Sequence, residues 1–207
     1  MRAGGGPHKL TRMRAEEISE WIAALAAPES GPRFHAARGI YDAGRAAARA
    51  ATRDWRRDAD LARLFIGEPT VGVAVRPEHF EAIRRANGSP KLAAAPPDED
   101  VQEFELHYSG GVSLDILTPR QAQGSGAIAR FLDRHGEGIQ QVELTVTDVE
   151  QAAALLQEHF SIFPLYAGTR AGADGTRVNF FLLPVPAGSG RVTGGKILIE
   201  LVQKPAE

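Results

Sequence analysis

The chain has 207 residues, with 24 Lys or Arg, 26 Asp or Glu and no cysteine, and its formal net charge is −2. This balance gives no sign of nucleic-acid binding, and the lack of cysteine excludes disulfides, thiolate zinc sites and cysteine nucleophiles, so any metal needs oxygen or nitrogen ligands. No apolar run of about 18 residues and no signal-peptide core is present, which predicts a cytoplasmic protein without membrane contact.

The N-terminal third is predicted to be a helical extension. Residues 15–29 and 36–66 are rich in Ala, Arg, Leu and Glu, and a proline-containing stretch at 28–32 separates them, which is typical of two helices. The excess of basic residues changes to an acidic excess after this region, so we place the extension at 1–66 and the main domain at 67–207. The first dozen residues are expected to be disordered. The extension could pack on the main domain, on a second subunit or on a partner protein, and the sequence does not decide between these three.

A first strand–helix–strands unit follows. Residues 70–75 have valine at every second position, which is typical of a strand, and Pro77 can begin a helix. Residues 101–108 and 112–117 then form a predicted hairpin around Ser109, Gly110 and Gly111.

A second unit repeats the order. Residues 139–146 alternate as a strand, Asp148 can cap the helix that follows, and residues 177–182 and 194–202 read as strands. A short helix at 127–134 links the two units. The two predicted modules span residues 68–120 and 138–204.

Polar side chains collect on one face of these strands. Because side chains alternate along a strand, the face opposite the apolar one should carry Glu103, Glu105, His107, Ser113, Asp115, Gln141, Glu143, Thr145 and Glu200. So many carboxylates do not suit a dry core, so we predict a wet cavity, a bound cation or a polar face open to solvent. Glu200 stands out because Leu198 and Val202 flank it on the same face.

An ordered set of short motifs carries a family resemblance. Residues 126–203 contain Gly126-Ala-Ile-Ala-Arg-Phe-Leu132, His135-Gly-Glu-Gly-Ile139, Asp174-Gly-Thr-Arg-Val-Asn-Phe180 and Gly195-Lys-Ile-Leu-Ile-Glu-Leu201. This set resembles the second half of methylmalonyl-CoA epimerases, which belong to the vicinal oxygen chelate superfamily with glyoxalase I and the extradiol dioxygenases. The resemblance implies an α+β fold in which paired βαβββ modules form a cupped sheet around a cavity, and it implies a homodimer.

The resemblance also implies a site. Epimerases hold a divalent cation at four strand positions, which fall here on Thr70, Asp115, Gln141 and Glu200. The second carboxylate base of the family falls on Glu103. We therefore expect Glu200 and Glu103 to be catalytic and Asp115, Gln141 and Glu200 to bind any metal, with Thr70 and His107 as secondary candidates.

The two imidazole ligands of the family are missing, because Thr70 and Gln141 stand in their positions. An all-oxygen set favours Mg²⁺ or Mn²⁺ over Zn²⁺ or Fe²⁺, and a metal-free site stays open.

Two functions follow from these expectations. The first is an isomerase- or lyase-type enzyme, in acyl-CoA or secondary metabolism, that removes a proton next to the carbonyl of a small molecule through an enolate, with Glu103 and Glu200 as bases. The alternative is a metal-free protein of the same fold that sequesters a small molecule such as an antibiotic. Three acids at the predicted site favour the enzyme, because a binding cavity for a drug has no need of them.

Overall fold

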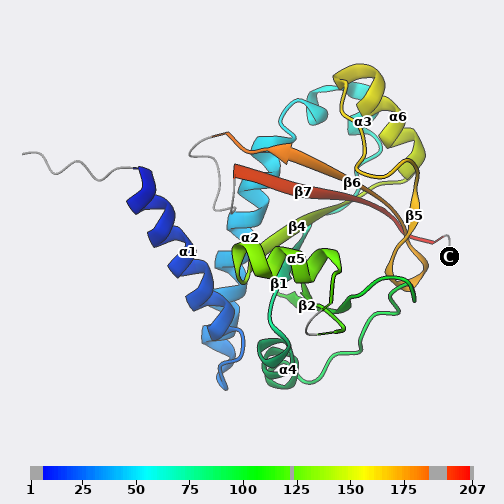
Figure 1. The fold of residues 1–207 in the computed structure, drawn as a ribbon. Coiled ribbons are helices and arrows are strands. Elements are labelled where there is room, and N and C mark those ends of the chain that lie inside the picture. The colour runs from blue at the N-terminus through cyan, green and yellow to red at the C-terminus, as the bar shows by residue number, and fades with distance from the viewer. Residues whose placement is uncertain (1–6, 122–123, 187–194, 206–207) are drawn as a thin grey trace, which may run out of the picture.

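The computed structural model describes residues 7–121, 124–186 and 195–205, and its strands form one curled sheet (Figure 1). The sheet is mixed, with parallel and antiparallel pairs, and its strand order is β2-β3-β1-β4-β7-β6-β5. The strands are β1 (Thr70–Ala74), β2 (Gln102–Tyr108), β3 (Val112–Thr118), β4 (Gly138–Thr145), β5 (Arg170–Ala171), β6 (Arg177–Pro184) and β7 (Lys196–Gln203).

Six α-helices and two 3₁₀ turns surround the described strands. The helices are α1 (Pro7–Ala24), α2 (Ser30–Ala51), α3 (Ala59–Ala62), α4 (Pro77–Ala86), α5 (Ala127–His135) and α6 (Val149–Phe160), and the turns are η1 (Trp55–Arg57) and η2 (Ala173–Gly175). No helix among the described residues is long and apolar enough to cross a membrane.

The predicted α+β class with two related modules and N-terminal helices is confirmed. The second module has the full order β4-α6-β5-β6-β7, whereas the first has β1-α4-β2-β3, with one strand fewer than expected. Residues 89–101, where that strand would lie, contain Pro90, Pro96 and Pro97, which cannot donate ladder hydrogen bonds. The segment still follows the free edge of β2, where Ala93 N donates to Glu103 O at 3.0 Å.

The outer face of the sheet carries the main core, and α2 lies across it. This helix contacts β1, β3, β4 and β7, and at Gly44 the approach is so close that a Cβ atom would come within 2.6 Å of Val71 Cγ1. Ile40 and Tyr41 of α2 are buried in the same core as Phe104 and Phe181 of the sheet. The long second helix is therefore part of the domain core.

The inner face is covered at one end only. Helix α5 buries Ile128 and Leu132 in a smaller cluster with Val101 and with Ala74 and Leu117 of the sheet. The part of the inner face beyond this cluster carries the polar side chains that the alternation predicts.

The N-terminal helices begin and end at other residues than we expected. Helix α1 begins at Pro7, inside the stretch for which disorder was predicted, while residues 1–6 lie outside the described part. The second helix spans Ser30–Ala51 and not residues 36–66, and the short elements η1 and α3 follow it. Pro32 does not separate the helices, because it sits in the first turn of α2, where its missing N–H has no helical partner to lose.

Candidate functional site

The inner face forms the wall of a cavity of about 780 Å³. Polar side chains from the central strands line it, and the loop at Pro90–Ala93 and the turn at Ala173–Thr176 close it at the sides. The polar strand residues on its wall are Thr70, Glu103, Glu105, His107, Ser113, Asp115, Gln141, Glu143, Thr145 and Glu200. All six residues that the sequence singled out for a catalytic or metal role thus lie around one cavity.

Strand register explains why acids from distant parts of the chain meet. Thr70 of β1 pairs with Glu143 of β4, which pairs in turn with Glu200 of β7. Glu105 of β2 pairs with Asp115 of β3. Because paired residues on neighbouring strands point to the same side of a sheet, alternation within each strand brings these side chains onto the same face.

Glu200 is the most enclosed of the glutamates that the sequence proposed. It is 9% exposed, and Gln141 beside it is 6% exposed. Gln141 Nε2 donates to Glu200 Oε2 at 2.6 Å and lies 3.4 Å from Glu143 Oε1. This amide therefore connects the acids of β4 and β7.

The secondary candidates are less enclosed. Thr70 is half-buried, and His107 is exposed at the end of β2. The His107 ring lies 2.8 Å from a Glu105 carboxylate oxygen and 3.2 Å from Ser113 Oγ. This histidine is accordingly held by its own strand neighbours.

The acids of the cavity hold protons unusually well. Burial, and then the negative charges of Glu99 and Asp174, raise the pKa of Glu103 from its ordinary 4.5 to about 7. Burial and Glu103 raise the pKa of Glu143 to about 8. For Asp115 and Glu200, burial followed by neighbouring carboxylates raises the pKa well above the ordinary value. Groups that exchange protons near neutral pH suit acid–base chemistry.

Glu143 is one of the residues that the alternation placed on this face but to which we assigned no role. The alternation of β4 places it on the inner face, and strand pairing sets it between Thr70 and Glu200. The strand pattern could not show that it shares Gln141 with Glu200, because that contact depends on the pairing of β4 with β7.

The residues do not fit the metal centre that the resemblance implies. Asp115 Oδ1 is a buried carboxylate oxygen without a hydrogen-bond partner, which a cation could satisfy. Within the described ranges, however, no three His, Asp or Glu side chains come close enough to hold one ion. The Gln141 amide binds one of the two Glu200 oxygens, Oε2, through its NH₂ end. The ligand set of Asp115, Gln141 and Glu200 stays a prediction, and we derive no chemical step through a metal.

A seam of hydrogen bonds closes the cavity between the two edges of the sheet. Ala94 N donates to Asp174 Oδ1 at 3.0 Å, and Asp174 N donates to Ala94 O at 3.1 Å. Asp174 adopts a left-handed backbone with φ of 50° to make these bonds, a conformation that Asp tolerates better than most residues. The turn after β5 is thus tied to the segment that follows the edge of β2.

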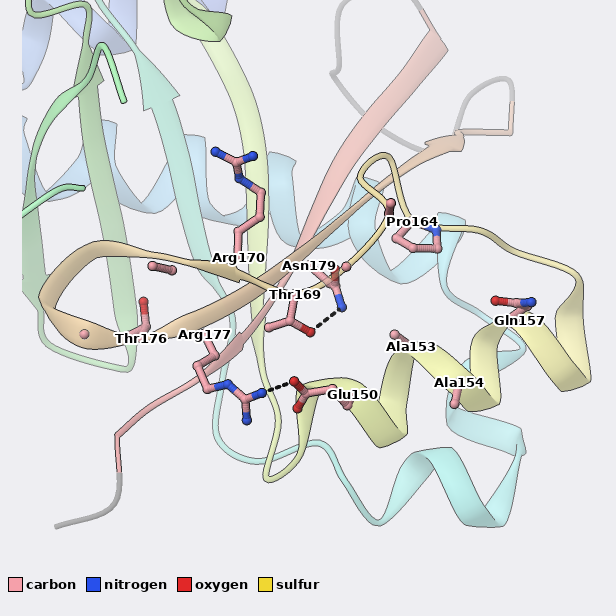
Figure 2. Close-up of a pocket in the computed structure, with 14 residues that line it drawn as sticks. Glu150, Ala153, Ala154, Gln157, Pro164, Thr169, Arg170, Thr176, Arg177 and Asn179 are labelled. Atoms are coloured by element: carbon pink, nitrogen blue, oxygen red, sulfur yellow. Dashed lines mark hydrogen bonds and ion pairs between the residues drawn. The ribbon is translucent and has the colours of Figure 1, made fainter. Parts of the chain in front are cut away.

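A second hollow, of about 700 Å³, lies on the other side of this turn (Figure 2). Helix α6 and residues 164–171 form its walls, and Thr176 lines both hollows. Its only carboxylate, Glu150, is paired with Arg177. None of the predicted site residues lies there, so the acidic cavity is the better candidate for catalysis.

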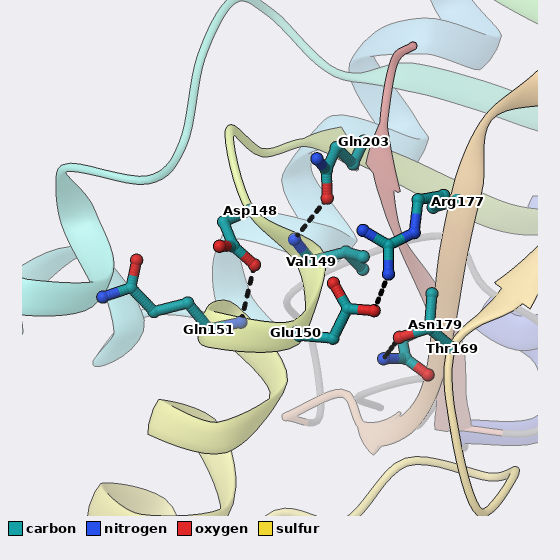
Figure 3. Close-up of polar contacts among 8 residues, drawn as sticks. All are labelled: Asp148, Val149, Glu150, Gln151, Thr169, Arg177, Asn179 and Gln203. Carbon is teal, nitrogen blue, oxygen red and sulfur yellow. Dashed lines mark hydrogen bonds and ion pairs between the residues drawn. The ribbon is translucent and has the colours of Figure 1, made fainter. Parts of the chain in front are cut away.

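Contacts beside the second hollow attach α6 to the strand that bears Glu200 (Figure 3). Asp148 Oδ1 accepts from Gln151 N at 2.9 Å, which is the predicted N-cap. Gln203 Oε1, near the end of β7, accepts from Val149 N at 3.0 Å. The first turn of α6 therefore fixes the end of β7, three residues beyond Glu200.

These elements define the class of fold. Two related modules, joined through β1 and β4 into a curled sheet with an acidic cavity on its inner face, make up the vicinal oxygen chelate fold. The sequence matches no family model and no curated protein.

Several solved structures have a fold similar to that of this chain. The methylmalonyl-CoA epimerase of Mycobacterium tuberculosis is 28% identical, with a TM-score of 0.53, over 69% of this chain and 91% of that one. Another methylmalonyl-CoA epimerase is 24% identical, with a TM-score of 0.52, over 69% and 98%. A hypothetical protein of Bacillus halodurans is 23% identical, with a TM-score of 0.51, over 67% and 94%. The predicted resemblance to the epimerases is confirmed at the level of structure.

Proposed function

We propose that this protein is an isomerase-type enzyme that moves a proton on the carbon next to a carbonyl group. The observation that carries the proposal is the presence of Glu103 and Glu200 in one cavity, on strands β2 and β7, with the pKa of each raised by burial. The likeness to an epimerase of known structure supports the same class of reaction.

The two glutamates suit complementary roles. Glu103, with a pKa of about 7, is ionised in a large fraction of molecules at neutral pH and can remove the α-proton. The C–H electron pair then moves to the carbonyl oxygen and forms an enolate. Glu200, with a pKa well above its ordinary value, retains a proton that it can give to the carbon from the other side. Groups whose surroundings separate their pKa values are the usual basis for such acid and base assignments.

The enolate oxygen needs hydrogen-bond donors, and this chain offers a protonated carboxyl group. Burial raises the pKa of Asp115 well above its ordinary value, so Asp115 can remain protonated at neutral pH and donate to a developing negative charge. The substrate is a small carbonyl compound, and an acyl-CoA thioester is the first to try.

Deuterium exchange tests the proposal. The protein in D₂O is incubated with methylmalonyl-CoA, then with simpler α-acidic thioesters and 2-substituted keto acids, and deuterium at the α-carbon is followed by mass spectrometry. We expect exchange with at least one compound and its loss in Glu103→Gln. Asp133→Asn, an exposed change on α5, should exchange like the wild type. Exchange that persists unchanged in Glu103→Gln would refute the assignment.

The second candidate function is sequestration of a small molecule without chemistry. The absence of three convergent metal ligands among the described residues favours it, as does a cavity large enough for a drug-sized ligand. Glu200→Gln distinguishes the two candidates, because it should abolish turnover in an enzyme and leave ligand affinity nearly unchanged in a binding protein.

A further inference from the structure

Gly72 and Gln141 face each other where β1 meets β4, and the sheet is irregular at this point. The register pairs Gly72 with Gln141 but the next residue, Val73, with Ile139, so β4 contains one extra residue, Gln140. A bulge of this kind redirects the side chain beside it and is frequent next to active sites.

The glycine is required by the close approach of Gln141. A Cβ atom on residue 72 would overlap Gln141 Cγ and would lie 3.1 Å from Leu117 Cδ1. A glycine within a strand often marks such a close approach. Any larger residue at position 72 would push the Gln141 side chain away from β1.

The Gln141 side chain ends between two carboxylates. Its Nε2 atom lies 2.6 Å from Glu200 Oε2 and 3.4 Å from Glu143 Oε1. A carboxyl group keeps one acceptor oxygen even when it is protonated, so the NH₂ end of the amide can donate to both neighbours in this arrangement. Gln141 and Glu200 are each more than nine-tenths buried, and a hydrogen bond shielded from water is electrostatically stronger than one in solvent.

We infer that Gly72 and Gln141 are positioning residues that hold Glu200 in one orientation, a role that rests on the proposed function of Glu200 in proton transfer. Among the hydrogen bonds of the described residues, Glu200 has this one only, and it occupies Oε2. Oε1 is therefore the oxygen that gains or loses the proton. Rotation of the carboxylate would exchange the two oxygens, and the amide opposes it, which keeps the reacting oxygen in place. At Glu200 the amide takes the place of the cation that the family resemblance implies.

The first test observes the hydrogen bond directly and needs no substrate. In a proton–nitrogen correlation spectrum, the Nε2 hydrogens of Gln141, assigned by their loss in Gln141→Ala, should be shifted downfield and slow to exchange with water. Glu200→Ala and Gly72→Ala should both move this signal to the position of an exposed amide. Gly168→Ala, whose added Cβ meets no atom within 4 Å, should leave it unchanged. A signal that Gly72→Ala does not move overturns the inference.

A double-mutant cycle tests whether the glycine acts through Gln141. Gly72→Ala should lower the urea midpoint of unfolding in the wild type. In the Gln141→Ala background the overlapping Cγ atom is gone, so the same change should lower the midpoint by much less. Coupling of this kind is expected only for residues in contact. Equal losses in the two backgrounds would show that Gly72 serves something other than Gln141.

The kinetic test separates positioning from substrate binding. For a compound that the wild type exchanges, Gly72→Ala and Gln141→Ala should lower kcat at least about tenfold and leave KM within about twofold. A higher KM with unchanged kcat would overturn the positioning role, because it would make Gln141 a substrate-binding residue. If the wild type exchanges no compound, the proposed function fails, whereas the spectrum and the double-mutant cycle still decide whether Gly72 and Gln141 hold Glu200.

Discussion

Replacement of Glu103 by Gln should raise stability and abolish catalysis at the same time. Glu103 is half-buried, and its pKa is raised from 4.5 to about 7, so the folded protein binds more protons than the unfolded chain between these pH values. Stability contributed by this residue therefore falls as pH rises through that window. Ionised Glu103 therefore lowers the free energy of unfolding by about 3 kcal/mol at pH 8, relative to a side chain without charge, and by less than about 1 kcal/mol at pH 5.

Urea unfolding at the two pH values measures this difference. Glu103→Gln keeps the shape of the side chain and removes its charge, so it should be more stable than the wild type by up to about 3 kcal/mol at pH 8 and by much less at pH 5. Glu105→Gln, two residues along the same strand but exposed, should change stability by less than about 0.5 kcal/mol. A variant that is less stable than the wild type at pH 8, or equally stabilised at both pH values, would refute the reasoning.

Three further predictions concern the base, the acid and the core. The exchange rate of the wild type should rise with pH and level off above about 7, because Glu103 must be ionised to remove a proton; a rate that falls over this range would contradict its role. Glu200→Gln should lower turnover by at least about 10²-fold with the fold intact by circular dichroism, and full turnover would remove Glu200 from the mechanism. Phe181→Ala, at a fully buried position, should cost about 3–5 kcal/mol in urea unfolding, whereas Leu182→Ala, 47% exposed, should cost far less; similar losses would mean that the core is assigned to the wrong face.

The alternation of the strands was enough to predict which side chains face the cavity. In β2 the apolar residues Phe104 and Leu106 point to the core, so Glu103 and Glu105 had to point the other way. The same argument placed Glu143 and Glu200 on the inner face. Period two is a local property, and it needs no knowledge of strand order.

Features that depend on neighbouring strands could not be predicted in this way. The pair Gln140 and Gln141 interrupts the alternation between Ile139 and Val142, but it does not show that β1 lies opposite or that the pairing shifts there. The need for glycine at position 72 also depends on which residue of β4 lies opposite it. These two features decide whether the amide of Gln141 meets Glu200 or points elsewhere.

The sequence contained evidence against one strand of the first module, but the family resemblance led us to expect that strand. Pro90, Pro96 and Pro97 stand between α4 and β2, where the βαβββ order of the family implies one more strand, and proline does not continue a central strand. The edge of β2 is nevertheless not left bare, because Ala93 N donates to Glu103 O there, and the bonds between Ala94 and Asp174 tie the same segment to the turn after β5. An edge covered in this way is protected from pairing with another chain.

The position of α2 bears on the predicted homodimer. This helix covers the outer face above β1, β3, β4 and β7 and buries Ile40 and Tyr41 there, so its removal would expose a large apolar surface. A second copy of the chain cannot use the same surface. A homodimer would therefore have to form elsewhere, and among the described residues the exposed side chains of Phe163, Leu165 and Tyr166, close together in the sequence, offer one apolar surface for it. Sedimentation of Phe163→Asp against the wild type tests this reasoning: a dimer that uses this surface should dissociate, and a dimer that persists unchanged must use another one.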